Sequence, residues 1–135
     1  MSGLSHYVAD KEWGYGIAFK LSSSKALTPE ETTEMAREAM KELAEEAIRR
    51  GAIMIGHIKC ILKASGGYVK ADTIGAKYGV YVEAKLTEPV REAILVVNSI
   101  VVGLSKDENI ELTRNLTKKV AEGYGFNVII LETKT

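Results

Sequence analysis

The side chains with the greatest chemical capacity in this sequence lie between residues 57 and 83. They are His57, Lys59, Asp72, Tyr81 and Glu83. A histidine beside a carboxylate can transfer protons, and a lysine or a phenol can hold an anionic group. If neighbouring strands carry these residues, the two-residue period of a strand places all five on one face of a sheet. The sequence therefore predicts a polar cluster that is a candidate binding site for a small anionic metabolite.

The same five side chains also have a purely structural interpretation. Cross-strand ion pairs on a solvated sheet face add little stability and need no ligand to explain them. Catalysis requires such groups to be desolvated and to have perturbed pKa values. The sequence alone leaves open whether the cluster is a site or a structural ion network, and whether the protein is an enzyme.

No metal or cofactor site is expected. His57 and Cys60 are three residues apart, so in a strand their side chains point to opposite faces. Cys60 is the only cysteine, which excludes a disulfide within the chain, and its apolar neighbours predict a buried, inert thiol. The Gly14-Tyr15-Gly16 triplet lacks the lysine and the following helix of a phosphate loop. Its glycines would admit either a closely approaching ligand or a bulge.

Sequence patterns predict the elements that position these residues. Apolar and polar residues alternate in several segments, which is typical of half-buried strands. Two capping boxes, at residues 28–31 and 105–108, each precede an apolar stripe with helical spacing. The predicted strands cover residues 7–21, 53–64, 91–104 and 126–132, with two shorter strands between 67 and 88, and the predicted helices cover 28–50 and 105–124.

Turn residues and charges predict how the central strands pair. Gly66-Gly67 is a strong two-residue hairpin signal, and it would place Ala64 opposite Val69. A longer loop within residues 75–79 places Lys70 opposite Glu83 and Asp72 opposite Tyr81, which avoids opposing like charges. A third turn at Glu88-Pro89 would then set Lys85 opposite Glu92 and complete a four-stranded meander.

These elements predict a single α+β domain over residues 1–135, with the order β-α-β-β-β-β-α-β. Each helix joins two strands as a crossover, and right-handed crossovers place both helices on one face of the sheet. The result is a two-layer α/β sandwich with a mostly antiparallel sheet. Its architecture resembles an elaborated ferredoxin-like plan, and fold alone does not imply a function.

The strand over residues 91–104 is apolar on both of its faces, although helices would cover only one. A strand that is apolar on both sides is normally covered on both sides, and monomers rarely expose a large contiguous apolar surface. We therefore expect the uncovered face to contact a second copy of the chain. The expected interface residues are Ile94, Val96, Asn98, Ile100 and Val102, with Ile55, Ile61 and Ile74 nearby on the same face.

Composition narrows the class of protein. The chain has 18 basic and 18 acidic residues, and this formal net charge of zero argues against a nucleic-acid partner. No apolar run is long enough for a membrane span, and no secretory signal pattern is visible, so a cytoplasmic location is expected. Glutamine is absent, and glutamate and lysine carry most of the charge, a composition that is typical of thermophiles.

The expected function is that of a homo-oligomeric interaction or ligand-binding module assembled through its open sheet face. A small molecule bound near His57, Lys59 and Asp72 would lie at the subunit boundary. The alternative is a small enzyme that acts on an anionic metabolite at these residues. RNA binding is the weakest hypothesis, because only Tyr68 and Tyr81 could stack on bases from this face.

Overall fold

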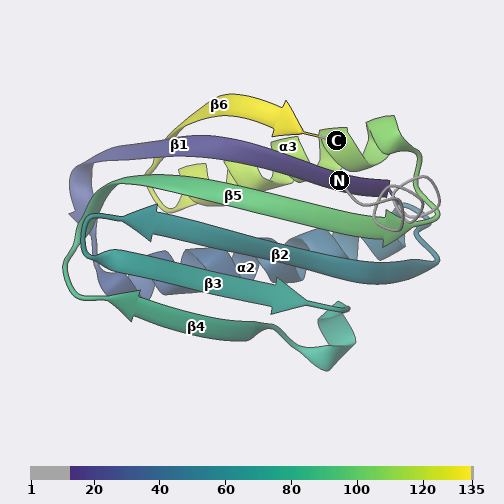
Figure 1. Ribbon diagram of the computed structural model, residues 1–135, viewed down its shortest axis with the longest axis horizontal. Helices are drawn as coiled ribbons and strands as arrows, with labels where there is room; N and C mark the ends of the chain where they lie inside the picture. The colour runs from purple at the N-terminus through teal and green to yellow at the C-terminus, as the bar shows by residue number, and fades with distance from the viewer. Residues whose placement is uncertain (1–12, 135) are drawn as a thin grey trace, which may run out of the picture.

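The computed structural model describes residues 13–134, with side chains described between 16 and 131. Six strands form one sheet, and two helices lie behind it (Figure 1). This confirms the predicted two-layer α+β sandwich and its element order. Residues 7–12 of the first predicted strand lie outside the described residues. The elements are β1 (Trp13–Leu27), α2 (Pro29–Arg49), β2 (Met54–Ala64), β3 (Gly67–Thr73), the 3₁₀ turn η1 (Ala76–Tyr78), β4 (Tyr81–Leu86), β5 (Val90–Val102), α3 (Lys106–Gly123) and β6 (Asn127–Lys134).

The two helices begin where the capping boxes predict. Thr28 and Ser105 each accept a hydrogen bond from the backbone N–H three residues later, and Glu31 and Glu108 each accept one from the backbone N–H of the capping residue. These reciprocal bonds satisfy backbone donors that a helix leaves unpaired at its first turn. The helix α2 packs on β2 and β3, while α3 packs on β1 and β6. No helix among the described residues is long and apolar enough to cross a bilayer.

The strand order differs from the predicted meander. The order is β4-β3-β2-β5-β1-β6, and every pair of neighbours is antiparallel. Strand β5 lies between β2 and β1, so Glu92 pairs with Ser22, while Lys85 pairs with Tyr68. The physical reason is the apolar character of β5 on both faces, which favours a central position where both strand edges are paired. Strands β6, β1, β5 and β2 with the two helices make the ferredoxin-like core, and the β3–β4 hairpin extends it.

The first hairpin also differs, by two residues. The turn is formed by Ser65 and Gly66, and Ala64 pairs with Gly67 where Val69 was predicted. Gly67 is a strand residue with a φ of 138°, and a Cβ atom there would lie 1.7 Å from the backbone oxygen of Lys85. The close approach of two backbones therefore explains this glycine. Because a shift of two residues keeps every side chain on its face, the predicted faces survive.

The second hairpin follows its predicted register. Lys70 pairs with Glu83, and Asp72 pairs with Tyr81. The loop between these strands contains η1. The observed register is the one that avoids placing like charges opposite each other, so the prediction is confirmed.

A β-bulge at Gly56 moves one residue from its predicted face. The pairing passes from Ile55 opposite Val101 to His57 opposite Ile100, so Gly56 is the extra residue. Ile55 was predicted on the open face, but this irregularity turns it toward the helices, where it is buried. A Cβ atom on Gly56 would lie 3.0 Å from Cγ2 of Ile100, so glycine leaves room for that side chain.

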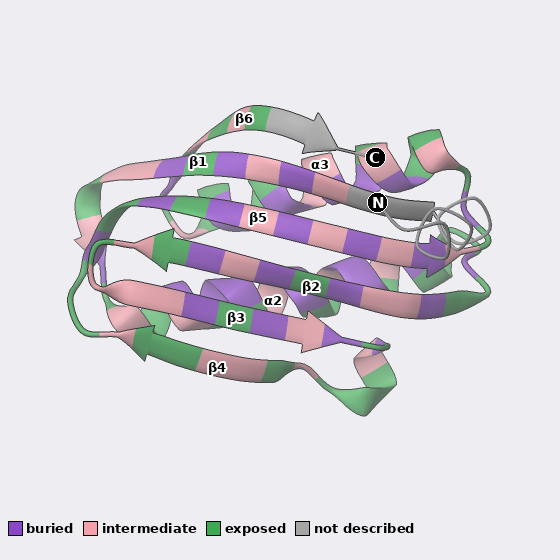
Figure 2. Ribbon diagram, viewed as in Figure 1, coloured by how far each residue is buried: buried purple, intermediate pink, exposed green. Residues whose placement is uncertain are grey.

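The core lies between the sheet and the helices. From Ala93 to Val102 of β5, buried residues alternate with exposed or partly buried ones, as Figure 2 shows. The largest fully buried side chains include Phe19, Met40, Leu43, Leu62 and Leu95. Cys60 is buried among them, as predicted, and it faces away from the open side of the sheet.

Candidate functional site

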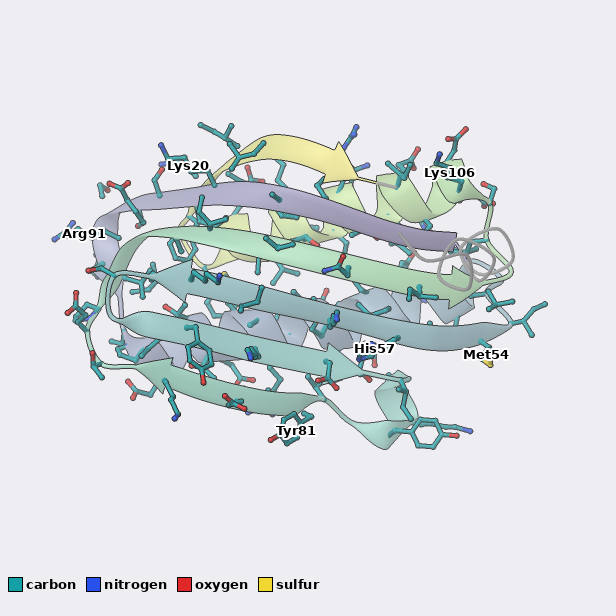
Figure 3. The ribbon with its side chains drawn as sticks, in the orientation of Figure 1. Lys20, Met54, His57, Tyr81, Arg91 and Lys106 are labelled. Atoms are coloured by element: carbon teal, nitrogen blue, oxygen red, sulfur yellow. The ribbon has the colours of Figure 1, made fainter. Side chains whose placement is uncertain are left out.

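The sheet face that the helices leave uncovered, called the open face below, carries two kinds of surface. Its polar cluster comprises His57, Lys59, Asp72, Tyr81 and Glu83 on β2, β3 and β4. Figure 3 shows His57 and Tyr81 on this part of the sheet. Its apolar patch comprises Ile61, Ile94, Val96, Ile100 and Val102 on β2 and β5. The strand registers place both sets on one continuous face.

The polar cluster is drawn together by adjacent rows of the sheet. Lys59 pairs with Asp72, and Asp72 pairs with Tyr81, so these three residues form one row. The Nε2 atom of His57 lies 3.9 Å from Oδ1 of Asp72. Four of the five predicted site residues are therefore neighbours.

Glu83 belongs to the next row and has its own partners. The hydroxyl of Tyr68 donates a hydrogen bond to a carboxylate oxygen of Glu83. This bond is the main reason that the pKa of Tyr68 is raised above its usual value, because it stabilises the protonated phenol. The Nζ atom of Lys70 lies 5.4 Å from the centroid of the Tyr68 ring. Glu83 thus takes part in a structural contact beside the cluster of four.

The solvent exposure of the polar cluster limits the acid–base chemistry that its side chains can perform. The side chains of His57 and Asp72 are 39% and 43% exposed, and their 3.9 Å separation exceeds a hydrogen-bond length. A solvated pair of this kind resembles a surface ion pair more than a catalytic dyad. A ligand or a second protein surface would have to exclude water before proton transfer became efficient.

Metal and thiol chemistry gain no support from the described residues. Within residues 13–134, no group of three or more histidine, cysteine, aspartate or glutamate side chains has a metal-binding arrangement. Burial raises the pKa of Cys60 to about 12, which keeps the thiol protonated.

The apolar patch is interleaved with lysines. Ile94 pairs with Lys20 on one side and Lys63 on the other, while Val96 pairs with Ala18 and Ile61. The predicted interface residue Asn98 pairs with Gly16 and with Lys59, so it joins the patch to the polar cluster. Among residues 16–131, whose side chains are described, the registers place five lysines (20, 59, 63, 70 and 85) and three acidic residues (72, 83 and 92) on the open face, a local basic excess in a neutral chain.

Sequence reasoning missed a second feature, an apolar cleft at one end of the molecule. This end cleft has a volume of about 580 Å³ and lies between the end of α2, the start of β2 and the η1 loop. Ile74, predicted on the open face, lies here beyond the end of β3. Met54 also lines this cleft and is exposed (Figure 3). The signal in the sequence was weak, because the lining comes from three segments far apart in the chain.

The geometry is the basis for assigning a function. No protein-family model, curated protein or solved structure matches this chain. Three surfaces have the chemistry of a functional site: the apolar patch, the polar cluster and the end cleft.

Proposed function

We propose that the protein is a homo-oligomeric α+β module whose open face packs against the same face of a second copy. The observation that carries this proposal is β5, which is apolar on both faces while helices cover only one. Ile94 is exposed, and Val96, Ile100 and Val102 are only partly buried. Burial of such side chains is the main favourable term in most protein association.

The size of the open face suits a stable interface. Six strands spaced about 4.8 Å apart span about 24 Å, and strands of 6 to 15 residues are about 20–50 Å long. The central part of this face therefore covers roughly 700 Å². A standard protein interface buries about 800 Å² of each partner, so the face is close to the required area.

The lysines of the open face add a distinctive property. In an interface with two-fold symmetry the same surface meets itself, so the basic excess of one copy faces that of the other. Salt screens such repulsion over about 10 Å at 0.1 M ionic strength. We therefore expect association to strengthen, not weaken, between 50 mM and 500 mM sodium chloride.

The test is the solution mass of the native protein and of Val96→Lys, measured by light scattering. Val96 lies at the centre of the patch, where a lysine would be buried without a partner. We expect the native protein to be a dimer or larger, and the variant to associate at least about a hundredfold more weakly. Ile48→Lys is the matched control, because Ile48 is an exposed isoleucine on α2, away from this face. A native monomer at micromolar concentration, or equal dissociation of both variants, would refute the proposal.

A cytoplasmic location completes this proposal. It is supported by the single cysteine, which is free and buried, because a reducing compartment preserves free thiols.

The second candidate function is catalysis on a small anionic metabolite by the polar cluster. The observation that favours it is the approach of His57 to Asp72 beside Lys59. A second subunit over the open face would bury these groups and place any ligand at the subunit boundary. In a metabolite screen, a ligand should raise the melting temperature of the native protein but not that of folded His57→Ala or Asp72→Asn. A screen without such a rise removes the support for this function.

A further inference from the structure

Most of the strongly exposed apolar side chains gather at the end cleft, not on the open face. Of nine large apolar side chains that are exposed among the described residues, five lie here, with exposed fractions from 49% for Ile48 to 80% for Ile53. The other three are Met54, Ile74 and Tyr78. This is far more apolar exposure than scattered surface residues would give.

The floor of the end cleft is closed and its walls come from three elements. Ala44 on α2 and Ile55 on β2 are buried and form the base. Ile48 rises on the helix side, and Ile74 and Tyr78 rise on the opposite side. A volume of about 580 Å³ lies within the range of about 300–1,000 Å³ that is usual for sites of small molecules.

The wall formed by the η1 loop is held in place by a buried hydroxyl. The Oγ1 atom of Thr73 accepts a hydrogen bond from the N–H of Gly75 at 3.0 Å and donates to the carbonyl of Gly79 at 2.8 Å. Both glycines have positive φ angles, 145° and 82°, which other residues rarely adopt. A loop fixed in this way costs little further ordering when a ligand binds.

Charges at the rim indicate the polarity of the occupant. Three charged residues line the cleft, namely Glu45, Arg49 and Lys77, so the lining has a net positive charge. Arg49 is paired with Glu46, which does not line the cleft. Lys77 lies 5.0 Å from the ring centroid of Tyr78 and has no carboxylate within 4.0 Å among the described residues. Lys77 is therefore the cation best placed to meet a negative group.

We propose that the end cleft binds a small amphipathic molecule with an apolar body and a single negative charge. The apolar body lies against Ile48, Met54 and Ile74, and the negative group lies at the rim near Lys77 and Arg49. Met54 pairs with Val102 of the apolar patch, so this site adjoins the open face, but binding in it does not require a second copy of the chain.

The test uses two fluorescent probes that share an apolar skeleton. One is 8-anilinonaphthalene-1-sulfonate, which carries one negative charge, and the other is the neutral N-phenyl-1-naphthylamine. We expect one sulfonate probe to bind per chain, about tenfold more tightly than the neutral probe, because only the sulfonate can accept a charged hydrogen bond from Lys77 or Arg49. The double variant Arg49→Gln/Lys77→Gln should remove this preference without weakening the neutral probe. The control Lys25→Gln/Lys118→Gln makes the same change in net charge at exposed sites outside the cleft lining.

A second pair of variants tests the apolar walls. Ile74→Ser should weaken both probes about fivefold, because it removes buried contact area from the complex. Leu131→Ser is its matched control, since Leu131 is 50% exposed on β6 and Ile74 is 56% exposed. Equal effects of the two serine variants, equal affinity for the two probes, or binding that does not saturate at one per chain would overturn the proposal. A fall in solution mass with Ile74→Ser would also overturn it, because the cleft would then be covered by a second copy.

Discussion

The Thr73 hydroxyl is the most informative single atom to remove. It lies in the core, accepts a hydrogen bond from Gly75 and donates one to Gly79. Thr73→Val keeps the branched shape of the side chain but leaves the buried N–H of Gly75 without this partner and removes the partly buried bond to the carbonyl of Gly79. The buried donor left in this way costs about 1–2 kcal/mol, and the lost bond to the carbonyl costs about 1 kcal/mol. We therefore expect the free energy of unfolding to fall by about 2–3 kcal/mol.

This loss is large relative to the stability of a domain, which is typically about 5–15 kcal/mol. For a chain of this length it corresponds to a fall in melting temperature of about 6–10 °C. Urea unfolding followed by circular dichroism measures the free energy. Amide hydrogen exchange in residues 75–79 should rise more than exchange in α2, because the loop loses its anchor.

Thr33→Val is the matched control for this variant. The Thr33 hydroxyl donates to the carbonyl of Pro29 at 2.7 Å, one turn back in α2. Such bonds contribute little to helices, so a loss below about 0.5 kcal/mol is expected. If Thr73→Val cost no more than Thr33→Val, the reasoning would be refuted. The backbone bonds from Tyr78 to Gly75 and from Gly79 to Ala76 would then suffice to hold the loop.

Three further predictions concern the rest of the fold. Cys60 should react with a thiol reagent at pH 8 only after denaturant is added, since burial raises its pKa to about 12. Gly67→Ala should destabilise the protein in urea far more than Gly79→Ala, because its Cβ would lie 1.7 Å from a backbone oxygen while Gly79 has open space. Glu31→Ala should destabilise the protein at pH 7, where the backbone N–H of Thr28 lowers the pKa of Glu31. The destabilisation caused by Glu31→Ala should disappear as the pH falls through this lowered pKa, because protonation of Glu31 removes the favoured charged form. Thr28→Ala, which removes the capping hydroxyl, should cost about 1 kcal/mol at pH 7.

Local chemistry determined the parts of the fold that the sequence could predict. Both helices begin at capping boxes whose hydrogen bonds involve residues three apart, so neighbouring residues contain the whole signal. The register that pairs Lys70 with Glu83 was also predictable, because the alternative would have opposed like charges. The placement of four of the five polar-cluster residues together followed from these short-range rules.

Features that depend on distant segments could not be predicted in the same way. The position of β5 between β2 and β1 is set by packing on both of its faces, and no turn sequence specifies it. The bulge at Gly56 depends on the space that Ile100 needs, a residue 44 positions away (100 minus 56). The end cleft requires three segments to meet, so alternation within any one of them could not reveal it.

The central position of β5 also affects the order in which the chain can fold. The pair formed by Ile17 and Val97 joins positions 80 apart (97 minus 17), whereas Ala64 and Gly67 are almost adjacent. Contacts between distant positions form slowly, because a long loop must close before they stabilise the chain. The β2–β3–β4 hairpins can therefore form early, while β1 has both of its neighbours, β5 and β6, near the C-terminal end of the sequence. During synthesis, a nascent chain that ends at Leu86 still lacks β5, so β1 and β2 cannot yet be joined in one sheet by the strand that lies between them.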